Sequence, residues 1–160
     1  FRSYDEMSLT LEPMSQGSFR NYLNYAIKNY ALEKEKIGTW TSDTAVDKAY
    51  ESYERLLPKG LATPNNYLFS IMFNSVTVGY IWIAKDVENE TAVFIFDFEI
   101  YSDYRNQGFG TEAIALIGQK AQKLGFSALG LHVFGNNSAA IHVYDKAGFF
   151  ATDIRMKKML

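Results

Sequence analysis

Three strand-like runs that follow one another directly constrain the fold of this chain more than any other feature. The segments 67–73, 76–84 and 92–101 are rich in β-branched and aromatic residues, which is typical of strands. Only Asn74-Ser75 separates the first two, and the polar loop 86–90 precedes the third. Because such short connections cannot join parallel strands, the three runs predict an antiparallel meander.

The hydrophobic period becomes helical after Gly108. Apolar residues then share one helix face, and Gly125 is placed to end that helix; the face consists of Ala113, Ile117, Ala121 and Leu124. Another strand-like run, 128–134, follows. A strand, a helix and a strand in this order predict a right-handed crossover, so that 92–101 and 128–134 should be parallel.

The flanking segments complete the order β-α-α-β-β-β-α-β-α-β. We expect a short strand at 8–12, amphipathic helices at 19–30 and 42–57, a short helix at 137–146 and a last strand at 149–160. The predicted fold class is α/β (α+β), with a mixed, mostly antiparallel sheet of six to seven strands and about four helices. A single domain is expected over 8–160, because no internal repeat or Pro/Gly linker interrupts it. Residues 1–7, which start with Phe1 and not Met, are interpreted as an N-terminal extension or a remnant of cloning.

Composition narrows the classes of function. The 160 residues contain 16 Lys and Arg against 18 Asp and Glu, which argues against a dedicated nucleic-acid binder. Cysteine is absent, so a disulfide, a zinc-thiolate site and a cysteine nucleophile are impossible. His132 and His142 have no second ligand at metal-binding spacing, so no metal is expected. The lack of cysteine, of a signal pattern and of a membrane-spanning apolar run favours the cytoplasm and no membrane partner.

The stretch YRNQGFGTEA, residues 104–113, places an arginine and two glycines between a strand-like run and a helical one. A helix N-terminus offers unpaired N–H groups, glycine lets an anion approach the backbone, and Arg105 adds a guanidinium suited to phosphate. The residues indicate a pyrophosphate cradle, while a plain strand-to-helix turn stays open. The stretch also matches the dinucleotide fingerprint G-x-G-x-x-A, but no acid that could hold a ribose ends the next strand.

A second pattern lies in LHVFGNNSAAIHVYDKAGFF, residues 131–150, where Asn137, Ala140 and Tyr144 share one helix face. Together with Arg105-x-x-Gly108-x-Gly110, it resembles the GCN5-related N-acetyltransferase (GNAT) family. That family carries R/Q-x-x-G-x-G/A after its fourth strand and N-x-x-A-x-x-x-Y-x-K-x-G-F later. The second motif is complete here, in Asn137, Ala140, Tyr144, Lys146, Gly148 and Phe149. The resemblance runs from about residue 8 to 160 and implies a GNAT-like sheet in one N-acetyltransferase domain.

The resemblance implies acetyl-CoA as the co-substrate. Its pyrophosphate would lie on backbone N–H groups of the loop formed by Arg105, Asn106, Gln107, Gly108, Phe109, Gly110 and Thr111. Its pantetheine arm would run beside the fourth strand, bonded to backbone near Phe98, Ile100 and Ser102, and the N–H at or near Ile100 would polarise the thioester carbonyl. Asn137 would bond the same arm, with Ala140 on the same helix face.

The resemblance also implies catalytic roles. Tyr144 would lie near the sulfur and protonate the leaving thiolate. A general base is expected because only a neutral amine attacks. Asp97 and Glu99 share the alternating face of Tyr101. Glu99 is the first choice because it lies nearer the predicted acetyl carbonyl, and a structural role for one or both carboxylates is the alternative.

We therefore predict an N-acetyltransferase that moves the acetyl group of acetyl-CoA to a primary amine by direct attack in a ternary complex. The acceptor would be a small-molecule amine or an amine of a protein or peptide, and a homodimer is left open. Two alternatives are a non-catalytic acyl-CoA binding or sensing module on the same fold and a nicotinamide-dependent oxidoreductase. The intact pair Asn137 and Tyr144 argues against the first, and the missing ribose-binding acid argues against the second.

Overall fold

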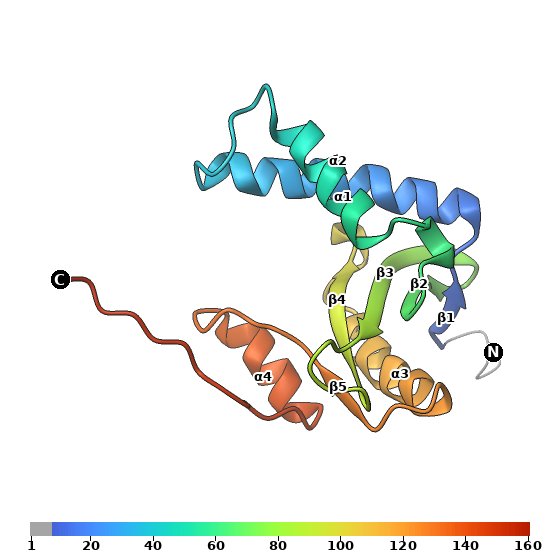
Figure 1. Cartoon of the computed structure of the whole chain (residues 1–160). Helices are drawn as coiled ribbons and strands as arrows, with labels where there is room; N and C mark the ends of the chain where they lie inside the picture. The colour runs from blue at the N-terminus through green and yellow to red at the C-terminus, as the bar shows by residue number, and fades with distance from the viewer. Residues whose placement is uncertain (1–7) are drawn as a thin grey trace.

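The computed structural model describes residues 8–160, so the interpretation of 1–7 as an extension falls outside the described residues. Figure 1 shows a twisted sheet with helices on both of its faces. In chain order the elements are β1 (Thr10–Pro13), α1 (Gln16–Lys36), α2 (Ala45–Leu56), β2 (Asn66–Phe73), β3 (Val76–Lys85), β4 (Ala92–Ile100), α3 (Phe109–Lys123), β5 (Ala128–Gly130) and α4 (Ser138–Lys146). Short 3-10 turns lie at Gly60–Ala62 and Ser102–Tyr104.

The sheet has the strand order β1-β2-β3-β4-β5. Strands β1 to β4 pair antiparallel, and β4 pairs parallel with β5, which confirms both the meander and the crossover. The predicted hairpin turn is also confirmed, because Asn74 and Ser75 have φ values of 50° and 64°. Positive φ at both central residues suits the right-handed twist of the flanking strands.

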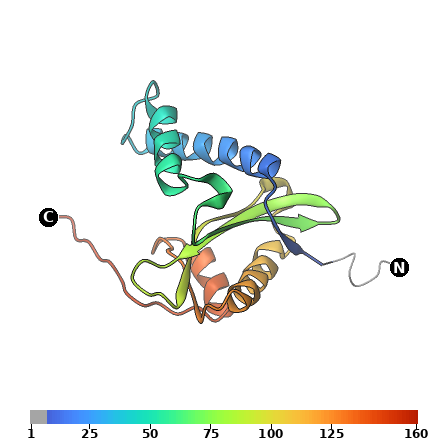
Figure 2. The same cartoon turned by 45° about the vertical axis from the view of Figure 1, so that its right-hand side comes forward.

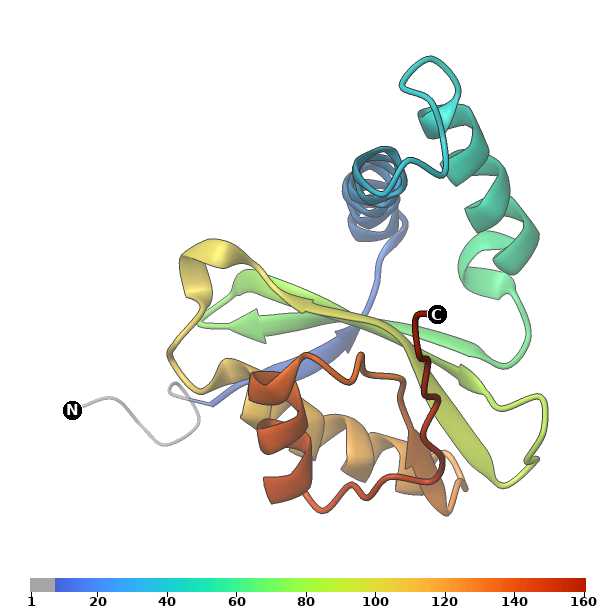
Figure 3. The same ribbon diagram turned by 90° about the vertical axis from the view of Figure 1, so that its left-hand side faces the viewer.

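Two layers of helix cover the sheet. Helices α1 and α2 lie on one face and α3 and α4 on the other, as Figures 1 and 3 show. Tyr22, Tyr80 and Trp82 belong to the core under α1, whereas Ile81, Ile95 and Ile117 belong to the core over α3. Burying apolar faces on both sides is what a β3 segment without polar alternation requires. None of the helices within residues 8–160 is long and apolar enough to cross a bilayer.

The prediction of six to seven strands is wrong, since the sheet within residues 8–160 has five. The run 128–134 pairs with β4 only over Ala128–Gly130, and the run 149–160 forms no strand. Both runs have the composition and alternation of strands, but a strand exists only where a neighbour accepts its hydrogen bonds. The C-terminal run leaves the body of the molecule instead, as Figure 2 also shows.

Candidate active site

An opening beside β4 brings seven of the fifteen predicted site residues together. Strand β4 pairs with β5 at Ala92, Val93 and Phe94, and within residues 8–160 nothing pairs with that edge of β4 beyond Phe94. A cavity of about 410 Å³ lies at the unpaired end of β4. It is lined by Phe98, Glu99, Ile100, Tyr104, Arg105, Asn106, Gly110 and Tyr144. Residues from β4, the following loop, α3 and α4 thus meet at one place.

A bulge in β4 decides which side chains face which helix layer. Ile83 is opposite Ile95, but Trp82 is opposite Asp97, so Phe96 is an extra residue in the ladder. Before the bulge Ile95 lies in the core over α3, and after it Phe98 and Ile100 face the same way. Asp97 and Glu99 are therefore directed towards α1. Bulges commonly re-aim side chains in this manner next to active sites.

The glycine-rich loop has the backbone that its sequence predicts. Gly108 is the N-cap of α3 with φ of 80°, and Asn106 has φ of 62°. Only glycine adopts this left-handed conformation without cost. The N–H groups in the first turn of α3 have no intrahelical acceptors and lie next to the cavity.

Gly110 is not required by the packing of the protein itself. A Cβ atom placed there would meet only the side chains of Ile100 and Phe98, each at 4.0 Å, which is ordinary contact. Gly110 nevertheless lines the cavity, and a side chain would project into it. The absence of a side chain at this position lets a ligand group in the cavity approach the backbone of α3.

Arg105 bridges the loop and β4. Its Nε donates to the backbone oxygen of Ile100 at 2.9 Å, and its guanidinium forms an ion pair with Glu99 Oε1 at 2.9 Å. The Arg105 side chain is 53% exposed and that of Glu99 is 24% exposed. The exposed guanidinium can turn to another anion without leaving a buried charge behind.

Tyrosines surround Glu99 as well. The Tyr25 hydroxyl donates to Glu99 Oε1 at 2.7 Å, and the Tyr80 hydroxyl lies 3.1 Å from Oε2. Tyr80 also lies 3.4 Å from Asp97 Oδ1. Because a phenol has one proton, Tyr80 donates to one of the two carboxylates at a time. Glu99 thus keeps a hydrogen-bonded, partly exposed carboxylate at the cavity wall.

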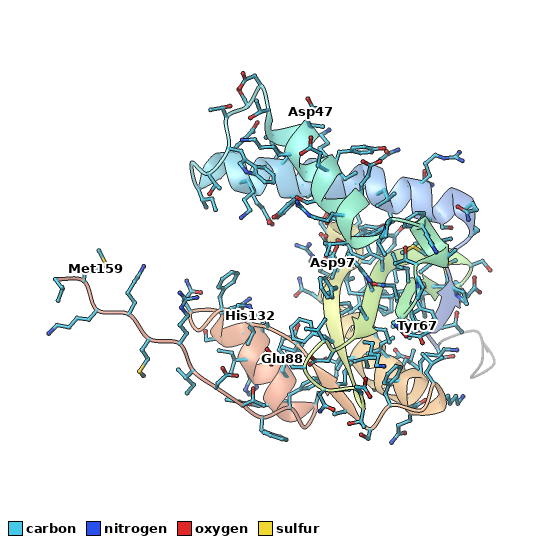
Figure 4. All side chains as sticks on the ribbon, viewed as in Figure 1. Asp47, Tyr67, Glu88, Asp97, His132 and Met159 are labelled. Carbon is cyan, nitrogen blue, oxygen red and sulfur yellow. The ribbon has the colours of Figure 1, made fainter. Side chains whose placement is uncertain are left out.

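Asp97 has a more enclosed setting. Figure 4 places it on β4 between the sheet and the layer of α1 and α2. The Tyr22 hydroxyl donates to Asp97 Oδ2 at 2.7 Å. Burial raises the pKa of Asp97, while the bond from Tyr22 opposes that rise. Asp97 does not line the large cavity, so of the two carboxylates only Glu99 has direct access to it.

A second, smaller cavity lies on the α1 side of the same strands. Its volume is about 230 Å³. It is lined by Met14, Ser18, Asn21, Tyr22, Ser70, Thr77, Gly79, Tyr80 and Tyr101. Two of its lining residues, Tyr22 and Tyr80, also contact the carboxylates of β4.

Tyr144 enters the large cavity from α4, and its ring packs 5.6 Å from that of Phe149. Burial raises the pKa of its phenol, which keeps the hydroxyl protonated at neutral pH. Asn137 is the N-cap of α4, where its Oδ1 accepts from the N–H of Ala140 at 3.2 Å. Capping accounts for Asn137 in structural terms and still leaves its amide N–H groups available.

The remaining predicted residues lie around the cavity without lining it. Phe109 is buried and packs 4.8 Å from the ring of Phe73, so only its backbone can face a ligand. Ser102 lies in the 3-10 turn after β4. The other predicted residues outside the lining are Asp97, Gln107, Gly108, Thr111, Asn137 and Ala140.

Sequence reasoning missed several tyrosines that lie around Glu99 and the cavity. Tyr25, Tyr80 and Tyr104 were not predicted as site residues, although all three contact Glu99 or the cavity. Their signal is weak in one dimension, because tyrosine at helical or strand spacing equally suits a core. Within residues 8–160 no group of three or more acidic or histidine side chains could hold a metal.

Comparison with known sequences identifies a matching protein family and two relatives that align over nearly the whole chain. The model of the Acetyltransferase (GNAT) family matches residues 25–149. The uncharacterized N-acetyltransferases YycN and YdgE of Bacillus subtilis (strain 168) are 40% and 32% identical over 156 residues. These alignments cover 96% of this chain, and 100% of YycN and 99% of YdgE.

Solved structures agree with the sequence comparison. The crystal structure of YycN from Bacillus subtilis superposes with a TM-score of 0.82 at 39% identity, covering 96% of this chain and 99% of that one. A structure of AAC(6')-Iy in complex with the bisubstrate analog CoA-S-monomethyl-acetylneamine has a TM-score of 0.61 at 14% identity, covering 95% of this chain and 97% of that one. At that identity the likeness concerns the fold.

Proposed function

Because the chain belongs to the acetyltransferase (GNAT) family and is an acetyltransferase, we propose that it transfers the acetyl group of acetyl-CoA to a primary amine by direct attack in a ternary complex. The observation that carries this proposal is the cavity in which Glu99, Arg105, Gly110 and Tyr144 converge from separate elements. A passive binding module needs no carboxylate and phenol facing one cavity, and a dinucleotide oxidoreductase would need a ribose-binding acid that the sequence lacks.

The residues around the cavity fit a CoA thioester. Gly110 leaves room for a group against the first turn of α3, whose N–H groups suit a pyrophosphate. The unpaired edge of β4 near Phe98 and Ile100 offers backbone groups to an extended amide-containing arm, in the manner of an added strand. Acetyl-CoA supplies an activated carbonyl and a thiolate leaving group. The N–H at or near Ile100 is proposed to polarise that carbonyl.

Glu99 is proposed as the general base. An amine resembling that of lysine is protonated at pH 7, and neutralising it costs about 4–5 kcal/mol. Glu99 faces the cavity, whereas Asp97 is enclosed by Tyr22 and Tyr80. We assign Asp97 the structural role of orienting Tyr80, whose hydroxyl also contacts Glu99. Glu99 takes one proton from the ammonium group before attack. The neutral nitrogen then bonds to the acetyl carbon, the carbon–sulfur bond breaks, and the second nitrogen proton is lost to water.

Tyr144 is proposed as the general acid. Its phenol lines the cavity and keeps its proton at neutral pH, because burial raises its pKa. The thiolate that forms as the carbon–sulfur bond breaks takes the phenol proton, and the phenolate left on Tyr144 regains a proton from water. Asn137 would hold the ligand through its amide N–H groups, since its oxygen already caps α4.

Arg105 links binding of the co-substrate to activation of the base. Its guanidinium is paired with Glu99 and more than half exposed. Two pyrophosphate charges attract a guanidinium more strongly than one carboxylate does. Binding of acetyl-CoA would thus draw Arg105 away and leave Glu99 free for the amine, which favours addition of acetyl-CoA before the acceptor.

The test combines calorimetric binding of acetyl-CoA with turnover measured from released CoA thiol. The chain has no cysteine, so a thiol reagent reports CoA alone. A panel of polyamines, aminoglycosides and lysine peptides serves as acceptors. We expect Glu99→Gln to lower kcat roughly 10²–10³-fold and Tyr144→Phe roughly tenfold or more, with acetyl-CoA affinity kept within about threefold. Asp97→Asn, the matched carboxylate control, should lower kcat less than about fivefold.

Three results would redirect the assignment. Equal losses in Glu99→Gln and Asp97→Asn would remove the distinction between base and structural carboxylate. Micromolar acetyl-CoA binding without turnover on any amine would support the acyl-CoA binding module instead. Binding of NADH without acetyl-CoA would support the oxidoreductase.

A further inference from the structure

The bulge in β4 places a phenylalanine ring on the surface beside the two carboxylates. Phe96 is the extra residue of the bulge, and it is 47% exposed. Its ring stacks on that of Trp82, with 4.9 Å between the ring centroids and 26° between the ring planes. Trp82 belongs to the core under α1, so Phe96 lies on the same face of the sheet as Asp97 and Glu99. Since Trp82 is stacked against one face of the ring, the exposed area of Phe96 is available to a ligand.

Neighbouring side chains hold the Phe96 ring in place. The indole Nε1 of Trp82 donates to Asn66 Oδ1 at 2.8 Å. The indole also contacts the ring of Tyr53 from α2, at 6.3 Å between centroids. Phe94 packs edge-on to Phe96 at 6.1 Å. Because the ring is already fixed by these contacts, little conformational entropy is lost when a ligand packs on it.

Strand β5 leaves space for these rings. Gly130 is paired with Phe94, and a Cβ atom at Gly130 would lie 3.3 Å from the Phe94 ring, closer than side chains normally pack. Beyond that pair the edge of β4, where Phe96 lies, has no paired strand within residues 8–160. Figure 3 shows this part of β4 between the layer of α1 and α2 and helix α4. Phe94 and Phe96, here named the aromatic platform, thus lie at the open edge of the sheet.

The spacing between the platform and Glu99 suits a short amine. Trp82 carries the ring of Phe96. Tyr80, two positions earlier on β3, has the hydroxyl that contacts Glu99 at 3.1 Å. Two residues of a strand span about 7 Å. An amine two carbon atoms away from an aromatic ring, with a hydrogen bond of about 2.8 Å to the carboxylate, covers a distance of that order.

The two ends of this surface suit different chemical groups. Glu99 is a hydrogen-bonded carboxylate that is 24% exposed, so it attracts an ammonium group. The platform presents aromatic carbon, which packs best against another flat ring. A polyhydroxylated amine would place hydroxyl groups against the platform, where no partner for them is offered. The combination favours a ligand with an amine at one end and an aromatic ring at the other.

We propose that the acceptor is an arylalkylamine, whose ring packs on the aromatic platform while its amine lies at Glu99. Phe96 is then a residue that determines specificity for the acceptor and takes no part in proton transfer. The proposal rests on the proposed function for the reaction at the amine, whereas the platform stands on the geometry around Phe96.

Turnover of matched amines gives the first test. Released CoA thiol is measured with phenethylamine, with cyclohexylethylamine, which has a ring of similar size without aromaticity, and with butylamine. We expect kcat/KM for phenethylamine to exceed that for cyclohexylethylamine roughly threefold or more and that for butylamine roughly tenfold or more. Equal values for the three amines would overturn the proposal. A higher kcat/KM for phenylalanylglycinamide, which carries the same groups on a peptide, would overturn the small acceptor in favour of a peptide N-terminus.

A matched pair of variants tests Phe96 itself. Phe96→Leu should lower the ratio of kcat/KM between phenethylamine and butylamine roughly fivefold or more, chiefly through the KM for phenethylamine. Tyr50→Leu removes another half-exposed ring, 52% exposed, from α2. It should leave that ratio within about twofold, because Tyr50 has no place in the platform. Calorimetric affinity for acetyl-CoA confirms that both variants are folded. An unchanged ratio in folded Phe96→Leu would overturn the proposal.

Amine binding separates a failure of the platform from a failure of the proposed function. Saturation-transfer NMR, with and without CoA in place of acetyl-CoA, reports binding without turnover. We expect the strongest transfer at the aryl protons of phenethylamine and a dissociation constant roughly fivefold or more higher in Phe96→Leu. Phenylethanol, which lacks the ammonium group, should bind roughly tenfold or more weakly. Such binding without turnover of any amine would support the platform and refute acetyl transfer. Turnover of amines without binding that depends on Phe96 would overturn the platform and leave acetyl transfer in place.

Discussion

Removing the Tyr22 hydroxyl is the sharpest test of how the carboxylates are held. Tyr22 donates to Asp97 Oδ2 at 2.7 Å, and the other phenol near Asp97, that of Tyr80, lies at 3.4 Å and is shared with Glu99. Tyr22→Phe keeps the buried ring and deletes only the donor. A hydrogen bond to a charged group stabilises by about 1.5–3 kcal/mol, so we expect the free energy of unfolding to fall by about 2 kcal/mol at pH 7–8.

The loss of unfolding free energy in Tyr22→Phe should depend on pH, and its direction follows from the pKa of Asp97. Burial raises the pKa of Asp97 in the folded protein, and the Tyr22 bond restrains that rise. A raised carboxyl pKa means that the folded state holds the proton more tightly than the unfolded one. Stability is then greatest below the unfolded pKa and falls as pH rises towards the folded pKa. Without Tyr22 the folded pKa rises further, so the deficit of the variant should grow as pH rises above the unfolded carboxyl pKa of about 4.

The assay is urea unfolding, monitored by the fluorescence of Trp82, which is buried in the same core cluster as Tyr22 and Tyr80. At low pH the deficit should shrink to about 1 kcal/mol, the value of a bond between neutral groups. Tyr25→Phe is the matched control, since it removes a bond of equal length to the more accessible Glu99 and should cost less. In an Asp97→Asn background the Tyr22→Phe deficit should lose its pH dependence. A deficit that is constant with pH, or unchanged in that background, would refute the reasoning.

Other parts of the fold give shorter predictions. Gly79→Ala would place a Cβ atom in overlap with the backbone oxygen of Glu99. The free energy of unfolding, measured in urea, should therefore fall by about 2–3 kcal/mol. Gly108→Ala forces a side chain into φ of 80° where no neighbour clashes, so stability should fall by about 1–2 kcal/mol and the calorimetric affinity for acetyl-CoA should weaken. Burial raises the phenol pKa values of Tyr22 and Tyr80. The folded protein therefore keeps protons that the unfolded chain releases above about pH 10, and urea midpoints should drop steeply there, less so in Tyr80→Phe.

Local patterns in the sequence predict the elements whose stability is local. The runs at 67–73 and 76–84 and the helix after Gly108 appear in the structure within one or two residues of their expected bounds. Turn glycines and the Asn74-Ser75 hairpin follow from backbone preference alone. The run 128–134 fails by contrast, since strand formation past Gly130 depends on a neighbour far away in sequence.

The site residues also divide into those that a local motif predicts and those that only the folded structure brings together. Residues joined by one motif, such as Arg105 and Gly110, are predictable because their spacing is local. The bonds from Tyr22 to Asp97 and from Tyr25 to Glu99 span 75 and 74 positions, and no spacing rule connects them. Only the packing of α1 on the sheet reveals that these phenols hold the carboxylates.

The bulge in β4 connects a local pattern to the placement of the carboxylates. Val93 and Ile95 are odd-numbered core residues, while Phe98 and Ile100 are even-numbered ones on the same side of the sheet. A regular strand cannot change phase in this way, because its side chains alternate strictly. The change of hydrophobic phase within AVFIFDFEI therefore requires an extra residue, and Phe96 is that residue. Without it Glu99 would point into the core over α3, where an unpaired carboxylate is costly. The shift in phase is thus what turns a carboxylate on β4 away from the core and towards the tyrosines of α1.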